Sequence, residues 1–218
     1  MNLAIIIPSY NSNNSLSKLI EIINQDYSMN IIAVDDGSDQ PFSSDYDNVD
    51  IIRNKENQGK GFSLRRGFKR AQERGFTHAI TLDADLQHSP NEIHKFVDVS
   101  DDIDFVLGYR LRDKSMPFHR KLSNRITTSL ISRLTNNKIL DSQCGFRRYN
   151  ISLINSFDYK EDGFQFESEV LIKCLPNGAS AKQVKIQTIY DINNKSYIRH
   201  VSDTIKFINL ILRSLIGK

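Results

Sequence analysis

Two aspartates, Asp83 and Asp85, follow a short apolar segment at residues 78–82. The segment is rich in apolar and β-branched residues, which is typical of a short buried strand. Residues 89–92, Ser-Pro-Asn-Glu, have the features of a helix start: a Ser cap, Pro at the first position and an acid in the first turn. The two carboxylates are therefore expected at the carboxyl end of a strand, the edge where open α/β sheets bind ligands.

Alternate side chains point the same way at a strand end, so Asp83 and Asp85 can converge. Converging carboxylates repel each other unless a cation or a shared proton lies between them. A site made of oxygen ligands suits Mg²⁺ or Mn²⁺, which take the rest of their ligands from water and from substrate phosphates. A pair of aspartates in a solvated turn is the alternative, and the pair alone does not exclude it.

The composition is that of an ordinary soluble globular protein, with 218 residues, 39% hydrophobic and 25% charged. A net charge of +3 is too small to indicate a nucleic-acid partner. Cys144 and Cys174 lack metal-ligand spacing and are expected to be free, buried thiols in a reducing compartment. Neither a secretory signal nor an apolar run long enough to span a membrane is visible, so a cytoplasmic location is expected.

The elements that position the aspartates alternate along the chain. Continuous apolar runs at 3–7 and 31–34 predict strands covered on both faces, and residues 50–53 predict another. Helices are expected for about 12 residues from position 14 or 15, and from 62 to about 74. This alternation predicts an α/β fold, a doubly wound and mostly parallel sheet flanked by helices, with a nucleotide-sized cleft where the strands end.

The turn after the first strand excludes one class of nucleotide site. A dinucleotide-binding Rossmann domain needs Gly-x-Gly-x-x-Gly there, so that a pyrophosphate can approach the following helix. The sequence at that point is Pro8-Ser9-Tyr10-Asn11, without a glycine. Nicotinamide or flavin binding of that kind is therefore not expected.

Several motifs in order resemble the family-2 inverting glycosyltransferases of the GT-A fold, and among them the dolichyl- and polyprenyl-phosphate sugar transferases most. The resemblance covers residues 3–175. It rests on the segments at 7–11, 34–39, 57–61, 82–90, 108–110, 141–147 and 164–169. The acid that usually closes the second motif falls one place early, at Asp39, so no role is assigned to it. The resemblance implies a single Rossmann-like GT-A domain.

The donor implied by the resemblance is a nucleotide-diphosphate sugar, a UDP- or GDP-sugar. Tyr10 can stack on a base, Asp35 or Asp36 can accept from a base or ribose group, and Lys60 can present its charge to phosphate. The alternative for Tyr10 is an aromatic side chain that covers the strand end, and for the Asp pair it is capping in a turn. The alternative for Arg65 is a solvated arginine on the helix. The predicted donor-binding residues are Pro8, Tyr10, Asn11, Asp35, Asp36, Lys60, Arg65 and Asp83.

In the family the Asp-x-Asp motif carries the divalent metal. The resemblance assigns the metal to Asp85 first and then to Asp83, with Gln87 as a further ligand. The metal, Mg²⁺ or Mn²⁺, would act as a Lewis acid on the leaving diphosphate. His88 follows these residues and is expected on the surface.

Residues 110–133 are strongly basic, which is typical either of a solvated face or of an anion site. The resemblance assigns the acceptor phosphate to Arg110 and Arg120, with Arg125 as a further candidate. A phosphate oxygen is already anionic and attacks without a strong base, whereas a sugar hydroxyl needs a carboxylate. Glu167 and Glu169 are the candidate bases, with an exposed helix start as the alternative.

Residues 201–216 are mostly apolar but too short and too charged to span a bilayer. We expect a glycosyltransferase domain at 1–198 and an amphipathic helix at 199–218. The helix either belongs to the same domain, contacts a second subunit in a homodimer, or lies peripherally at the cytoplasmic membrane surface.

These observations predict a metal-dependent inverting glycosyltransferase that moves a sugar to a polyprenyl phosphate. Transfer to a saccharide hydroxyl in surface-polysaccharide assembly is the main alternative. A nucleotidyltransferase would need a Gly-rich, Arg-bearing loop after the first strand, and a non-catalytic sugar-nucleotide-binding protein is the remaining class. The sequence leaves open the sugar, the base and the metal.

Overall fold

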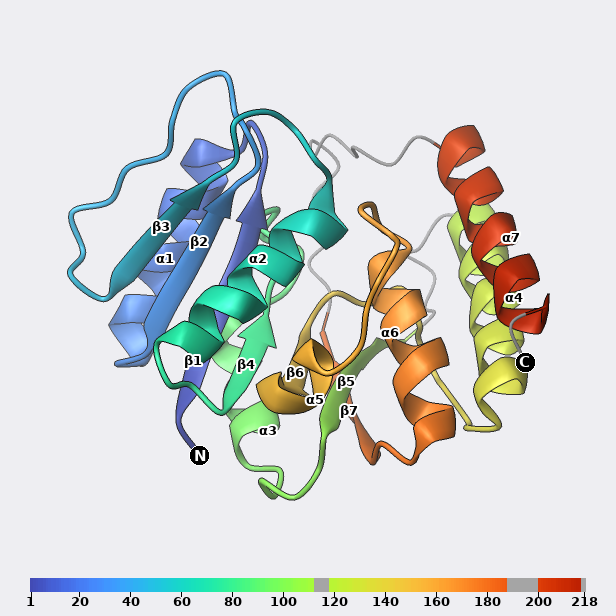
Figure 1. Ribbon diagram of the computed structural model, residues 1–218. Coiled ribbons are helices and arrows are strands. Elements are labelled where there is room, and N and C mark those ends of the chain that lie inside the picture. Colours follow the sequence, from blue (N-terminus) through green and yellow to red (C-terminus); the bar gives the residue numbers. More distant parts are fainter. Residues whose placement is uncertain (112–117, 188–199, 217–218) are drawn as a thin grey trace.

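A seven-stranded sheet runs through the computed structural model, which describes residues 1–111, 118–187 and 200–216 (Figure 1). The order in the sheet is β3-β2-β1-β4-β6-β5-β7. Strand β6 is antiparallel to β4 and β5, and the other neighbours are parallel, as predicted for a mostly parallel sheet. The strands are β1 (Leu3–Ser9), β2 (Asn30–Asp35), β3 (Val49–Arg53), β4 (His78–Thr81), β5 (Phe105–Arg110), β6 (Arg147–Asn150) and β7 (Ala181–Ile186).

Helices cover both faces of this sheet because alternate residues of each strand point to opposite sides. On β1, Ile5 and Ile7 join the core cluster of α1 (Asn13–Asp26) and α3 (His94–Val97). Ala4 and Ile6 join the cluster on the other side. The helices that contribute to that second cluster are α2 (Lys60–Glu73), α4 (Phe118–Thr135), α5 (Ile151–Asn155), α6 (Phe166–Cys174) and α7 (His200–Ile216).

A helical turn does start within residues 89–92, with Ser89 before it, Pro90 at its start and Glu92 as the acid of the first turn, but the helix is short. The chain forms a single 3₁₀ turn, η1 (Pro90–Glu92), before the four-residue α3, and Ser89 makes no side-chain cap. Glu92 instead accepts from Lys95 Nζ (2.6 Å) and from the backbone N–H of Gln187 (2.8 Å). The acid therefore ties this turn to the end of β7. A second 3₁₀ turn, η2 (Leu175–Asn177), follows α6.

Strand β6 begins with two arginines. It was not predicted, because its sequence lacks the apolar pattern of a buried strand. Arg147 donates to the carbonyls of Ser142, Cys144 and Glu167, at 2.6 to 3.0 Å. Arg148 donates to carbonyls between residues 96 and 103. Both side chains are fully buried, and backbone oxygens accept from most of their donors, although Nε of Arg148 has no hydrogen-bond partner among the described residues.

Cys144 and Cys174 are free and buried, as predicted. Within residues 1–111, 118–187 and 200–216, no helix has the length and apolar character needed to cross a bilayer.

Candidate active site at the carboxyl edge of the sheet

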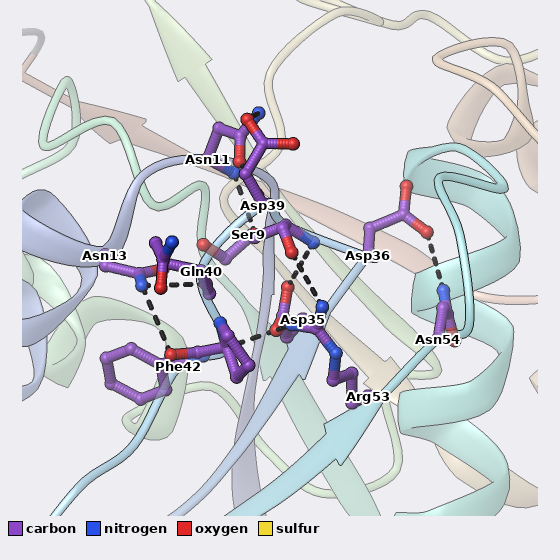
Figure 2. A network of polar contacts seen from close by, with 12 residues as sticks. Ser9, Asn11, Asn13, Asp35, Asp36, Asp39, Gln40, Phe42, Arg53 and Asn54 are labelled. Carbon is purple, nitrogen blue, oxygen red and sulfur yellow. Dashed lines mark hydrogen bonds and ion pairs between the residues drawn. The ribbon is translucent and has the colours of Figure 1, made fainter.

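Asp35 ends β2 and accepts hydrogen bonds from its own loop (Figure 2). Its carboxylate accepts the backbone N–H groups of Ser38 (2.9 Å) and Phe42 (3.3 Å) and pairs with Arg53 of β3. Burial alone would raise the pKa of Asp35, but the bonds from Ser38, Phe42 and Arg53 hold it below its usual value. The carboxylate therefore fixes the ends of β2 and β3 relative to each other.

Asp36 fixes the next loop. Its oxygens accept from the side chain of Asn54 (2.6 Å) and from the backbone N–H groups of Gln58 (3.0 Å) and Gly59 (2.8 Å). These bonds set where α2 begins, one residue later, at Lys60. Asp36 thus fixes the position of Lys60 indirectly, through the loop that precedes it. Local sequence spacing does not predict these loop contacts.

The first strand contributes a smaller network at the same edge. Asn11 donates to Asp39 (3.1 Å) and accepts the backbone N–H of Asp39 (2.8 Å), while its own N–H donates to Ser38 Oγ (2.9 Å). Figure 2 shows Asn11 beside Asp39, above Asp35. Pro8 and Tyr10 are half-buried next to this network.

A largely buried lysine, with 13% of its side chain exposed, lies between two carboxylates. Lys60 Nζ is 2.6 Å from Asp83 Oδ1 and 3.1 Å from Glu167 Oε2. Burial would lower the pKa of Lys60, but the two carboxylates outweigh it and hold the pKa well above its usual value. The second oxygen of Glu167, Oε1, is buried without a hydrogen-bond partner in the part of the chain that the structure describes.

Three glycines make room for this cluster. A Cβ on Gly59, whose φ is +103°, would lie 2.4 Å from the Asp162 carbonyl oxygen, and a Cβ on Gly61 would lie 2.6 Å from that of Glu161. A Cβ on Gly145 would lie 2.5 Å from Asp83 Oδ2. The glycines on either side of Lys60 thus let the backbone of residues 161–162 pack closely against the start of α2.

Asp85 lies close enough to Asp83 for the two charges to interact. Burial, and then the charge of Asp83, raise the pKa of Asp85 to about 6. Its Oδ1 accepts the backbone N–H of Gln87 (3.0 Å) across Leu86, which adopts a left-handed φ of 60°. A non-glycine residue in this region stores strain, as is common at functional sites.

These residues fit a hard divalent cation. Among the described residues, no group of three or more His, Cys, Asp or Glu side chains could enclose a metal. Mg²⁺-type sites need only one or two carboxylates, because substrate phosphates and waters complete the shell. Asp83, Asp85 and the half-buried Gln87 provide such a partial set.

Arg110, at the end of β5, is held by Asp141. Its Nε and Nη2 donate to the two oxygens of Asp141 at 2.7 and 3.2 Å, and Asn124 of α4 donates to the same carboxylate (2.7 Å). Burial would raise the pKa of Asp141, but Arg110 and Asn124 lower it to about 2. Arg125 is exposed on α4, and the side chain of Arg120 lies outside the described part of the chain.

Arg65 and Glu169 contact a different segment. Arg65 donates to the Glu161 carbonyl (2.7 Å) and pairs with Asp162. Glu169 accepts the backbone N–H groups of Lys160 (3.0 Å) and Glu161 (2.9 Å) and pairs with Lys173. Both side chains therefore hold the loop before α6. None of these hydrogen bonds or ion pairs is with Lys60.

His88 is buried, so its expected surface position is wrong. It is 4% exposed, with its ring 5.9 Å from that of Phe146, and burial lowers its pKa to about 4. Sequence reasoning assigned no role to Asp141, Asn124 or Gly145. The motif at 141–147 pointed to the region, but the pairings are set by the tertiary fold.

Residues 4–161 match the family model described as Glycosyl transferase family 2. A UDP-N-acetylglucosamine–dolichyl-phosphate N-acetylglucosaminyltransferase of Methanococcus voltae is 29% identical over 213 residues, which cover 85% of this chain and 85% of that protein. A dolichol-phosphate mannosyltransferase of Pyrococcus furiosus is 28% identical over 236 residues, which cover 95% of this chain and 64% of that protein.

The fold also matches a solved structure. Glucosyl-3-phosphoglycerate synthase from Mycobacterium tuberculosis, in complex with Mn²⁺, UDP and phosphoglyceric acid, gives a TM-score of 0.72 at 15% identity. The match covers 99% of this chain and 78% of that one. It confirms the predicted α/β fold of GT-A type.

Proposed function

The chain belongs to glycosyl transferase family 2, and we propose from this premise that it transfers a sugar, with inversion, from a UDP- or GDP-sugar to a polyprenyl phosphate. The family makes it a glycosyltransferase, and the relatives named above act on dolichyl phosphate. The donor, the acceptor and the divalent metal are the parts of the proposal that experiment has to test.

One observation carries the choice of acceptor. Neither candidate base has an exposed, unengaged oxygen: Glu169 accepts from two backbone N–H groups and Lys173, while Glu167 accepts from Lys60 through Oε2 and its Oε1 is buried. A saccharide hydroxyl has to lose a proton as it attacks, so it needs an available base. A phosphate oxygen is anionic near neutral pH and needs none, which favours a phosphate acceptor.

On the donor side, the cluster at the sheet edge suits a diphosphate. Asp85, Asp83 and Gln87 would hold Mg²⁺ or Mn²⁺, which when bound neutralises charge on the leaving nucleoside diphosphate. Lys60 adds a fixed positive charge beside these residues. Pro8, Tyr10 and Asn11, with the loops fixed by Asp35 and Asp36, would hold the nucleoside, and Arg65 supports the loop that packs on Lys60.

On the acceptor side, Arg110 would bind the phosphate. Asp141 fixes the orientation of the guanidinium through two hydrogen bonds, and a planar guanidinium is well suited to binding a phosphate. Arg120 and Arg125 of α4 would complete the site. Because this acceptor is a membrane lipid and the donor is soluble, the enzyme would work as a peripheral protein on the cytoplasmic face.

The decisive experiment is a transfer assay. A panel of UDP- and GDP-sugars is incubated with Mg²⁺ or Mn²⁺, with a short-chain polyprenyl phosphate or a saccharide acceptor. The expected result is a sugar–phosphate-linked lipid from one donor. Transfer to the saccharide, with none to the lipid phosphate, would overturn the proposal.

The variant Glu167→Gln sharpens this test because glutamine can still accept from Lys60. If the acceptor is a phosphate, we expect the turnover of Glu167→Gln to stay within about tenfold of the wild type. If Glu167 is the base for a hydroxyl acceptor, turnover should fall by at least about a hundredfold.

A further inference from the structure

The last helix, α7, has two apolar faces, and the fold uses one of them. Phe207, Leu210 and Ile211 pack with the core cluster shared with α4 and α6. The opposite stripe is exposed, with each side chain at least 50% accessible. It consists of Ile205, Ile208, Leu212 and Leu215. Their spacing of three and four residues places them on one side of the helix.

Helix α4 carries a second exposed apolar patch. Leu122 (49% exposed) and Ile126 (52%) lie one turn apart, while Asn124, Thr128 and Ile131 on the same helix are buried. Figure 1 draws both α4 and α7 on the side of the molecule opposite α1 and β3, with α7 in front of α4.

Most of the large exposed apolar side chains of the described residues belong to these elements. The described residues include ten such side chains. Six of them lie on α4 and α7, namely Leu122, Ile126, Ile205, Ile208, Leu212 and Leu215, and a seventh, Leu111, lies just after β5. Leu111 directly follows Arg110, the residue assigned to the acceptor phosphate. We name these seven residues the apolar edge surface. Clustered exposure of this kind marks an interaction site rather than the scattered exposure of a typical surface.

The charge around this surface is positive. Lys121, Arg125 and Arg133 lie on α4, where residues 121–135 include no acid. On α7, Lys206 is exposed beside the stripe, and Arg213 pairs with Glu161. Basic residues beside an apolar helix face are typical of helices that lie on anionic membranes.

We propose that the apolar edge surface docks onto an anionic lipid bilayer, with α7 and α4 lying in the interface. The inference rests on the proposed function, since a membrane-embedded acceptor must be reached from the bilayer. A second copy of the chain fits less well. Two-fold pairing would bring the same basic side chains together with few acids to neutralise them.

Vesicle flotation of the full chain tests the docking directly. Vesicles of phosphatidylcholine, with or without phosphatidylglycerol, are compared at low and high salt. We expect binding to the anionic vesicles that weakens as salt rises. The double variant Ile208→Asp/Leu212→Asp should lose at least about tenfold in binding, because two apolar side chains leave the interface and negative charge is added.

Two further variants keep the result interpretable. Leu122→Ser/Ile126→Ser removes the α4 patch without adding charge, and should weaken binding in the same direction. Tyr46→Asp changes a side chain that is 45% exposed but lies outside the apolar edge surface, and should leave binding unchanged. Circular dichroism and thermal melting establish that each variant is folded.

Transfer assays separate docking from function. A short-chain, water-soluble polyprenyl phosphate needs no bilayer, so Ile208→Asp/Leu212→Asp should retain turnover with it and lose turnover only with a long-chain acceptor in vesicles. Wild-type transfer to the short acceptor without vesicle binding would overturn the docking alone. A lack of transfer to either lipid would overturn the proposed function, while flotation still decides the docking. A wild-type dimer that the double variant abolishes, without vesicle binding, would show instead that the surface is a subunit interface.

Discussion

At the scale of single residues, Lys60 is the side chain on which most of the site depends. It neutralises Asp83 and Glu167, which come from loops and helices far apart in the chain. Removing one partner of a buried ion pair leaves an uncompensated charge, which is more damaging than the loss of an exposed pair.

We expect Lys60→Met to lower the free energy of unfolding by about 3–5 kcal/mol and to reduce turnover by at least about a hundredfold. Urea denaturation and the transfer assay measure the two effects. Lys69→Met, at an exposed position of the same helix, is the matched control and should change neither. Wild-type stability in Lys60→Met would show that the pair does not stabilise the fold.

The Arg110–Asp141 pair predicts a pH dependence of stability. The pKa of Asp141 is about 2 in the folded protein against 3.8 for the unperturbed group, so the unfolded chain binds a proton more readily. The pair therefore contributes about 2 kcal/mol above pH 4, and this contribution is lost as the pH falls from about 4 towards 2.

Comparison of the wild type with Asp141→Asn by urea denaturation checks this expectation. The difference in unfolding free energy should shrink across that pH range. A difference that stayed constant from about pH 6 to pH 2 would mean that the carboxylate is not held by Arg110.

Residue types were predictable from the sequence, but their partners were not. Arg110 and Asp141 are 31 positions apart, and Lys60 and Glu167 are 107 apart. No local periodicity relates such positions, so only the assembled sheet determines which charges meet.

At the scale of elements, α2 is flanked by two glycines, Gly59 directly before its start and Gly75 just after its end. Gly59 and Gly75 both have a positive φ, but only Gly59 has backbone atoms within 4 Å of where a Cβ would lie. The two positions therefore separate the cost of the backbone conformation from the cost of the steric clash.

We expect Gly75→Ala to destabilise by about 1–2 kcal/mol, from the left-handed backbone alone. Gly59→Ala should cost about 1–3 kcal/mol more, since the Asp162 carbonyl has to move, and should reduce turnover by displacing Lys60. Urea denaturation of both variants gives the comparison. Equal losses would mean that the 161–163 segment yields without strain.

The early strands and helices were predictable because their apolar residues follow a clear period. Strands β1 to β4 and helices α1 and α2 lie where the pattern placed them, within a few residues. Strand β6 was missed because its buried arginines donate to carbonyls from other segments. The helix start at 89–92 was predictable from Ser89, Pro90 and Glu92, but the bond between Glu92 and the residue after β7 was not.

At the scale of the whole molecule, the sheet separates two core clusters, one on each face, and the candidate site lies at its carboxyl edge. The doubly wound sheet followed from the alternation of strands and helices. The position of the antiparallel β6 between β4 and β5 could not be predicted in this way. The order of these strands depends on the later part of the chain, whose apolar residues are less periodic.

Removal of metal should affect activity and stability differently. Chelation is expected to abolish transfer, while the melting temperature changes by less than about 2 °C, since Lys60 already neutralises Asp83 inside the protein. Thermal melting with and without chelator measures this, and addition of metal together with a nucleoside diphosphate should raise the melting temperature. A fall of many degrees on chelation alone would contradict it.

The internal lysine has a consequence for how the enzyme would respond to metal supply. A protein whose fold depends on its metal unfolds and is degraded when the metal becomes scarce. Here the site carries its own positive charge, so a shortage of metal would leave an intact but idle enzyme. Glycan assembly could then resume as soon as metal returned, without new protein synthesis.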